Sequence, residues 1–227
     1  MACMLSTMQE VPFSVARILE FGTTAHANTK CTTWRASGAE ETTFAEIGAR
    51  AAAFAHALHS DLGIDGDQRV STLLYNCAEH IEVMFAVAAK GAVFNPLNVQ
   101  LMADQIAYVV NHSESEVVVA DPRLAEKLGA ILRDCPTVRA VAFTGIAPLD
   151  DAAAHLPDTV QVYSYEQLLD GRPTSYPWPE LPENTAAALV YSTATTGAPK
   201  GVAYSHRSLW LEATGLRATD SLSLIHI

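Results

Sequence analysis

The sequence predicts an α/β fold with layered sheets flanked by helices, built around mainly parallel strands. Short apolar runs alternate along the chain with segments whose apolar residues recur at helical spacing. Turn and cap residues separate these segments at short intervals, which is the pattern of repeated strand–helix–strand units. The 227 residues, 49% of them hydrophobic, suffice for one sizeable core or for most of a larger domain.

Helices are expected where an apolar stripe is framed by cap residues. The clearest one opens with a capping box, in which Thr43 precedes Glu46 by three positions, and Gly63 is expected to end it. Asp121 caps another helix, with Pro122 at its first position. The expected helices cover residues 12–21, 44–62, 78–90, 103–112, a stretch from 122, one turn at 164–167, and 206–216.

Strands are expected in short runs of β-branched, aromatic and other apolar residues bounded by turn residues. The fully apolar run 186–191 is typical of a buried strand. The expected strands cover residues 32–34, 70–75, 93–94, 116–120, 138–143, 160–163, 186–191 and 202–204, with 41–43 pairing back onto the first. Residues 144–158 read as a loop, and the proline-rich stretch 171–184 as an extended surface connector rather than a domain boundary.

The charge balance excludes some partner classes. The chain carries 25 acidic and 14 basic residues, a formal net charge of -11, and no basic cluster. Nucleic acid and anionic membrane surfaces are therefore poor partners. There is no transmembrane run and no secretory signal pattern. The cysteines are widely separated and predict reduced thiols in a cytoplasmic protein; they are Cys3, Cys31, Cys77 and Cys135.

A hydroxyl-rich loop follows the run 186–191 and precedes the strand expected at 202–204. Small residues let backbone N–H groups approach an anion, hydroxyls add donors, and a lysine adds a point charge. The loop is therefore predicted to bind phosphate. Its candidate residues are Ser192, Thr193, Ala194, Thr195, Thr196, Gly197 and Lys200. The alternative is a Ser/Thr-rich hairpin that binds nothing.

The loop differs from the common phosphate motifs but resembles another. G-x-x-x-x-G-K-[ST] and G-x-G-x-x-G are both absent from it. The order S-T-A-T-T-G-A-P-K-G-V, followed by Y-S-H-R-S, resembles the signature loop of the adenylate-forming superfamily, most closely its fatty-acyl-CoA ligase branch. The upstream blocks T-F-A-E-I, L-G-I-D-G-D-Q-R-V and N-P-L-N-V-Q-L resemble the same family, in the same order. The resemblance covers roughly residues 10–222.

This resemblance implies a two-step ligase. A carboxylate, a fatty acid in this branch, reacts with ATP to give acyl-AMP and pyrophosphate, and coenzyme A then takes the acyl group as a thioester. Lys200 is implied as the catalytic charge beside the leaving pyrophosphate, with the other loop residues binding nucleotide. Ser192 stands where a hydroxyl contacts Mg²⁺ directly or through water. An aryl or amino acid substrate, or a fragment that only binds nucleotide, are the alternatives.

Relatives in the superfamily continue well beyond this chain. Residues 1–227 are therefore expected to be the N-terminal part of an AMP-binding domain, without the small C-terminal domain that carries a second catalytic lysine. The resemblance fails within residues 221–227, which is consistent with a truncated gene model or with read-through into an adapter sequence. A natural compact variant is the alternative. Residues 1–227 alone are expected to make no thioester.

Three histidines are candidates for metal binding or acid–base chemistry. His56 and His59 lie one turn apart on an expected helix, but no third ligand accompanies them, so an exposed helix face is favoured over a metal site. His206 follows the loop at the start of a helix. Adenylation of an ionised carboxylate needs no proton abstraction, which favours a helix-start or substrate-wall role over that of a general base.

Ala194 stands where the family has glycine, and its effect on nucleotide binding can be tested. Glycine at such a position provides either a positive φ or room beside Cα for phosphate. Because a phosphate-binding backbone must approach its ligand closely, we expect crowding, so that Ala194→Gly tightens ATP binding without changing the melting temperature. Calorimetry and ATP titration on both forms are the measurement. Equal affinities would contradict the crowding argument, and a raised melting temperature would indicate backbone strain.

Overall fold

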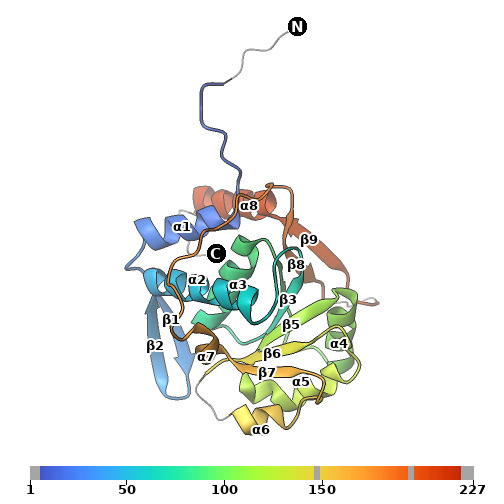
Figure 1. Ribbon diagram of the computed structural model, residues 1–227. Coiled ribbons are helices and arrows are strands. Elements are labelled where there is room, and N and C mark those ends of the chain that lie inside the picture. Colours follow the sequence, from blue (N-terminus) through green and yellow to red (C-terminus); the bar gives the residue numbers. More distant parts are fainter. Residues whose placement is uncertain (1–5, 146–148, 194–196, 221–227) are drawn as a thin grey trace.

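The computed structural model describes residues 6–145, 149–193 and 197–220 (Figure 1). Its centre is a seven-stranded sheet in the order β7-β6-β5-β3-β4-β8-β9. All neighbouring strands pair in parallel except β8 and β9, which are antiparallel. The strands are β3 (Arg69–Leu73), β4 (Val93–Pro96), β5 (Ser115–Ala120), β6 (Ala140–Phe143), β7 (Gln161–Ser164), β8 (Ala186–Tyr191) and β9 (Gly201–Ser205). The predicted α/β class, with a mainly parallel sheet, is confirmed.

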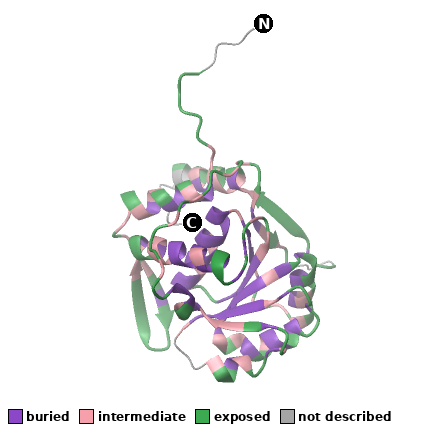
Figure 2. Cartoon of the chain, in the orientation of Figure 1, coloured by how far each residue is buried: buried purple, intermediate pink, exposed green. Residues whose placement is uncertain are grey.

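Helices cover both faces of the sheet. One core contains residues of α1 (Val15–Ala25), α2 (Phe44–Ser60), α3 (Ala78–Lys90), α7 (Tyr165–Leu169) and α8 (His206–Asp220). The other contains residues of α4 (Ala103–His112), α5 (Ala125–Leu132) and α6 (Leu149–Ala153), with η1 (Pro122–Leu124) leading into α5. Because side chains alternate along a strand, Val117 and Val119 of β5 reach the first core while Val118 and Ala120 reach the second. Figure 2 shows this as nearly continuous burial along the central strands.

Several local predictions are confirmed. α3 and α4 have the predicted bounds, and α3 ends at Gly91, whose φ of 101° is readily adopted only by glycine. At the start of α2 the capping box forms, since Thr43 Oγ1 accepts from the Glu46 N–H and Glu46 Oε2 accepts from the Thr43 N–H. β1 (Lys30–Arg35) and β2 (Gly38–Thr43) form the expected antiparallel hairpin ahead of this helix. No helix in the described part of the chain is long and apolar enough to cross a membrane.

Other boundaries were predicted wrongly. α1 begins at Val15, since Ser14 caps it, and it continues to Ala25 beyond the expected end. α2 stops at Ser60, short of residue 62. The expected loop at 144–158 contains the short helix α6. β8 is buried only at Ala187 and Ala188, and Val190 is exposed, because the strand belongs to a hairpin at the end of the sheet.

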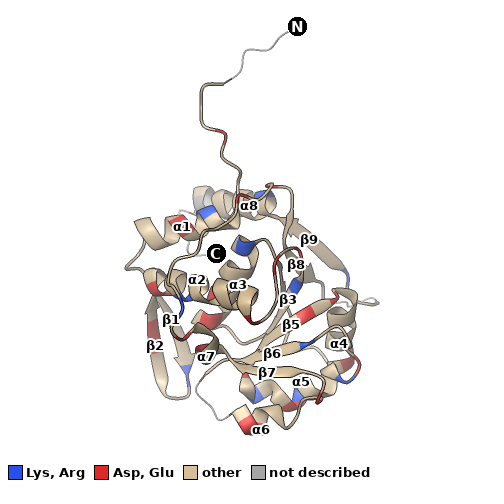
Figure 3. Ribbon diagram, in the orientation of Figure 1, with Lys and Arg blue, Asp and Glu red and all other residues tan. Residues whose placement is uncertain are grey.

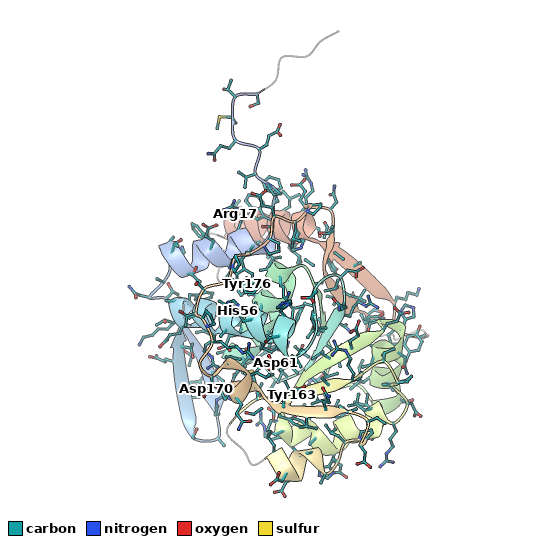
Figure 4. All side chains as sticks on the ribbon, in the orientation of Figure 1. Arg17, His56, Asp61, Tyr163, Asp170 and Tyr176 are labelled. Atoms are coloured by element: carbon teal, nitrogen blue, oxygen red, sulfur yellow. The ribbon has the colours of Figure 1, made fainter. Side chains whose placement is uncertain are left out.

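The connector 171–184 runs over α2 with no regular secondary structure, as predicted (Figure 4). Arg172, near its start, pairs with Asp61 at the end of α2. Farther along, the Ser175 carbonyl lies 2.9 Å from Nε2 of His56, and the Tyr176 ring meets the same imidazole edge to face at 4.8 Å between centroids. These contacts lay the connector along α2 and bring the chain round to β8.

A buried charged network joins α2, α3 and α7. Glu82, which is only 1% exposed, accepts hydrogen bonds from Arg50 Nε at 2.8 Å and from the Tyr165 hydroxyl at 2.9 Å. Arg50 also pairs bidentately with Glu166, at 2.7 and 3.0 Å. Burial raises the pKa of Glu82 to about 7, although Arg50 and Tyr165 act in the opposite direction. The carboxyl group therefore exchanges its proton near neutral pH.

The pH dependence of the unfolding free energy should reveal the titration of Glu82. A carboxyl whose pKa is about 7 when folded and 4.5 otherwise binds more protons in the native state, so its contribution is fully present below pH 4.5 and is lost as the pH rises to 7. Glu82→Gln cannot titrate. Relative to this variant, the wild type should lose on the order of 1–3 kcal/mol of unfolding free energy across that window.

Denaturant unfolding of both forms at pH 4.5, 6 and 8 provides the measurement, with circular dichroism as the check that each remains native. If the difference between the two forms is the same at every pH, Glu82 does not titrate in this window and the assignment is wrong.

Candidate functional site

The predicted phosphate loop connects β8 to β9 at the edge of the sheet. β8 pairs in parallel with β4 through Phe94 and Ala188, and its last residue, Tyr191, contacts His112, which lies just before the amino end of β5. A strand rather than a helix follows the loop, so no helix N-terminus contributes to anion binding here.

Two backbone donors close the base of the loop. The Ser192 N–H donates to the Lys200 carbonyl at 3.0 Å, and the Lys200 N–H donates to the Ser192 hydroxyl at 3.1 Å. Ser192, Thr193 and Lys200 are all exposed. The structure therefore brings the backbones of Ser192 and Lys200 side by side, although the two residues are eight positions apart in the sequence.

Gly197 has a φ of 142°, in the region that residues with side chains rarely adopt, and no atom of the described residues lies within 4 Å of where its Cβ would stand. Glycine is therefore required by the backbone and not by crowding. The other predicted loop residues, Ala194, Thr195 and Thr196, lie outside the described residues, as do residues 221–227.

Lys200 differs from Arg123, a cation just beyond the end of β5, in whether its charge is paired. Arg123, just beyond β5, pairs bidentately with Asp121 and lies over the Tyr75 ring at 4.9 Å. Burial alone would raise the pKa of Asp121, but hydrogen bonds from Arg123 lower it below the ordinary value, so this pair is already neutralised. Lys200 forms no ion pair with any described residue. Figure 3 shows the basic residues scattered over the molecule.

Sequence reasoning did not identify Gly201, a position at which there is little space for a side chain. A Cβ there would stand only 3.0–3.2 Å from the Tyr191 ring, so the tyrosine packs directly on the glycine backbone. The glycine is visible in the motif, but the ring that needs it is identified only by the β8–β9 register, in which Tyr191 is paired with Gly201.

His206 is fully buried where α8 meets α1. Its Nδ1 accepts a hydrogen bond from the Val15 N–H at 3.3 Å, and its Nε2 has no partner among the described residues. Burial lowers its pKa, so the ring is neutral at physiological pH. This geometry ties the first turns of the two helices together and fits the helix-start role.

The histidines of α2 have separate contacts. His56 meets the connector, and His59 pairs with Asp65. In the described ranges, no group of three or more His, Cys, Asp or Glu side chains could hold a metal ion. Cys31, Cys77 and Cys135 are free thiols, and Cys3 lies outside the described residues.

The described residues form an α/β protein in which the predicted phosphate loop connects the last two strands of a mainly parallel sheet. The chain belongs to the AMP-binding enzyme family, whose model matches residues 22–224. It is 32% identical to a medium-chain-fatty-acid–CoA ligase of Ectopseudomonas oleovorans and 31% identical to a 3-methylmercaptopropionyl-CoA ligase of Ruegeria pomeroyi. These alignments cover 97% and 96% of this chain but only 40% of each relative. The chain is thus homologous to acid–thiol ligases and spans about 40% of their length.

Solved structures share the fold. The anthranilate CoA ligase AuaEII in complex with anthranoyl-AMP superposes with a TM-score of 0.78 at 21% identity, over 91% of this chain and 37% of that one. A putative long-chain-fatty-acid CoA ligase from Rhodopseudomonas palustris gives 0.74 at 25% identity, over 93% and 49%. The mixed sheet and flanking helices correspond to the N-terminal domain of these enzymes.

The backbone of the loop can be tested at Gly197. Gly197→Ala should lower the unfolding free energy by about 1–2 kcal/mol, because a side chain is strained at this φ although space is open. Gly66→Ala is the matched control: its φ is not positive and the nearest atom to its Cβ would be 3.8 Å away, so little change is expected. Denaturant titration measures both. Equal stabilities for the Gly197 variant and the wild type would show that the loop does not hold this conformation.

Proposed function

We propose that residues 1–227 form the N-terminal part of an ATP-dependent acid–thiol ligase, and that the loop from Ser192 to Lys200 holds the phosphates of ATP. The observation that carries the proposal is Lys200, an exposed lysine without an ion pair to any described residue, whose backbone N–H donates to the Ser192 hydroxyl. Membership of the AMP-binding enzyme family supports ATP as the ligand.

The chemistry has two balanced steps. A carboxylate oxygen of the acid attacks the α-phosphorus of ATP, the bond to the β-phosphate bridging oxygen breaks, and acyl-AMP and pyrophosphate result. The sulfur of coenzyme A then attacks the acyl carbon, AMP leaves, and the thiol proton passes to solvent. Negative charge grows on the pyrophosphate in the first step. Lys200 and the loop donors stabilise that charge and exchange no proton, because a preorganised cation is what this step requires.

The described residues fit a magnesium ion only in part. Ser192 offers one exposed hydroxyl oxygen, whose acceptor capacity is partly used by the Lys200 N–H. Mg²⁺ in nucleotide sites typically takes most of its ligands from phosphates and water, so one protein oxygen suffices. When bound with ATP, the ion offsets phosphate charge; Ser192 is the residue proposed to touch it, directly or through water.

The substrate is proposed to be a fatty acid. The support is the 32% identity to a medium-chain-fatty-acid–CoA ligase. Structures of the same fold include enzymes named for anthranilate and benzoate and a complex with 3-methylaspartate, so aryl and amino acids are the alternatives. ATP–pyrophosphate exchange with a medium-chain fatty acid, benzoate or an amino acid separates them, since only the true substrate class stimulates exchange.

Two further parts of the proposal concern the length of the protein. We propose that the site is completed by a C-terminal portion, as in the relatives of which this chain spans about 40%. Residues 1–227 alone then make no thioester. Sequencing the locus past codon 227 is the test. A reading frame that continues supports the ligase, and a genuine stop supports the alternative, a fragment that binds nucleotide without catalysis.

Lys200→Ala in the complete protein should slow acyl-adenylate formation by roughly 10- to 1000-fold, the range for loss of one preorganised charge at a reacting phosphate. Exchange of pyrophosphate at saturating ATP measures this step. Lys30→Ala is the matched control, because Lys30 is also exposed but pairs with Glu41 on the β1–β2 hairpin. Lys30→Ala should exchange normally, and a normal rate in Lys200→Ala would remove the lysine from the mechanism.

A further inference from the structure

Tyr191, the last residue of β8, is held by a residue from a distant part of the chain. Its hydroxyl lies 2.7 Å from Nδ1 of His112, the last residue of α4. The two rings meet edge to face, with centroids 5.7 Å apart and an interplanar angle of 87°. The ring of Tyr108, one turn earlier on α4, lies 5.5 Å from the same imidazole between centroids. The tyrosine ring is thus fixed in position and in rotation.

The Tyr191 ring also packs against β9, the strand that follows the loop. Tyr191 and Gly201 are directly paired in the β8–β9 ladder, and the ring lies so close to the Gly201 backbone that a Cβ there would stand 3.0–3.2 Å from it. The next pair inward on the loop is Ser192 and Lys200, joined by the two hydrogen bonds at the base of the loop. An imidazole on α4 is therefore linked to Lys200 through one aromatic ring and one ladder pair.

The Tyr191 hydroxyl can act as the donor of this hydrogen bond at physiological pH. Partial burial, with Tyr108 nearby, raises the pKa of Tyr191, so its hydroxyl keeps its proton. With a neutral imidazole the hydroxyl donates to Nδ1, which leaves the ring proton on Nε2. His112 itself is exposed, and its ring does little for the core.

We propose that His112 and Tyr191 are positioning residues for the phosphate loop: His112 orients the Tyr191 ring, and the ring holds the β8–β9 base from which Ser192 and Lys200 reach the nucleotide. The inference rests on the proposed function. It assigns His112 no contact with substrate. In chemical terms, a small shift of the loop base would move the lysine relative to the leaving phosphates. The reaction rate depends strongly on how precisely such groups are positioned.

The test uses ATP–pyrophosphate exchange by the complete protein, with separate KM values for ATP and for the acid. His112→Phe keeps the ring but loses the acceptor, and Tyr191→Phe loses only the hydroxyl. Each should lower kcat/KM for ATP by about 3- to 10-fold, the effect of one hydrogen bond, while KM for the acid stays unchanged. The double variant should be no worse than either single one, because both remove the same bond. His112→Asn, whose amide lies near the position of Nδ1, should restore most of the activity.

Two variants control for nonspecific damage. Tyr163→Phe removes a tyrosine hydroxyl that binds Gln161 on β7, at the far end of the sheet (Figure 4), and His59→Phe replaces an exposed histidine of α2. Both should exchange like wild type, and all variants should melt near its temperature. Normal kinetics in His112→Phe, additive losses in the double variant, or equal effects on both KM values would each overturn the inference alone. Absence of exchange in the wild type with every acid would instead overturn the proposed function, and this inference with it.

Discussion

β8 has two different neighbours, and the position of the loop depends on both. Its inner half pairs in parallel with β4 and contributes the small buried residues Ala187 and Ala188 to the core. On its other side it pairs antiparallel with β9 from Ala186 to Tyr191, and toward its end it leaves the core, so Val190 is 38% exposed. The parallel pairing attaches β8 to the central strands, and the antiparallel pairing fixes the width of the loop. Without a helix after the loop, its anion affinity must come from N–H groups, hydroxyls and a lysine.

Polar groups inside the protein determine how the elements are placed. Asn95 donates to Ser71 and Ser113 between the central strands, at 2.9 and 3.0 Å, and Ser71 bonds Ser115 at 2.6 Å. These contacts form only when β3, β4 and β5 are in this register, so they favour one pairing over a slipped one. In the same way, the hydrogen bonds that join Arg50, Glu82, Glu166 and Tyr165 favour one arrangement of α2, α3 and α7. Breaking a buried pair costs more than the pair contributes, which makes such groups specific rather than strongly stabilising.

Much of this fold can be predicted from local sequence, because caps and glycines act locally. Gly91 ends α3 as expected, and Thr43 with Glu46 starts α2. The five-residue helix α6 is too short to show a period. The apolar run of β8 predicts a strand but not its exposure, since burial depends on which strand lies beside it. In the site, the order of hydroxyls, glycine and lysine identifies the loop. The partner of Tyr191 is 79 residues away, and no local pattern identifies His112.

The strand order also has a consequence for synthesis on the ribosome. The part of the chain that is translated before β8 contains β3 to β7, and these strands are contiguous in the sheet. β8 does not join the neighbouring edge at β7; it joins the opposite edge, beside β4, after a long connection. While residues 97–185 are being made, the outer edge of β4 is therefore unpaired and open to strands of other nascent chains. Chaperone binding during elongation should be concentrated in this interval.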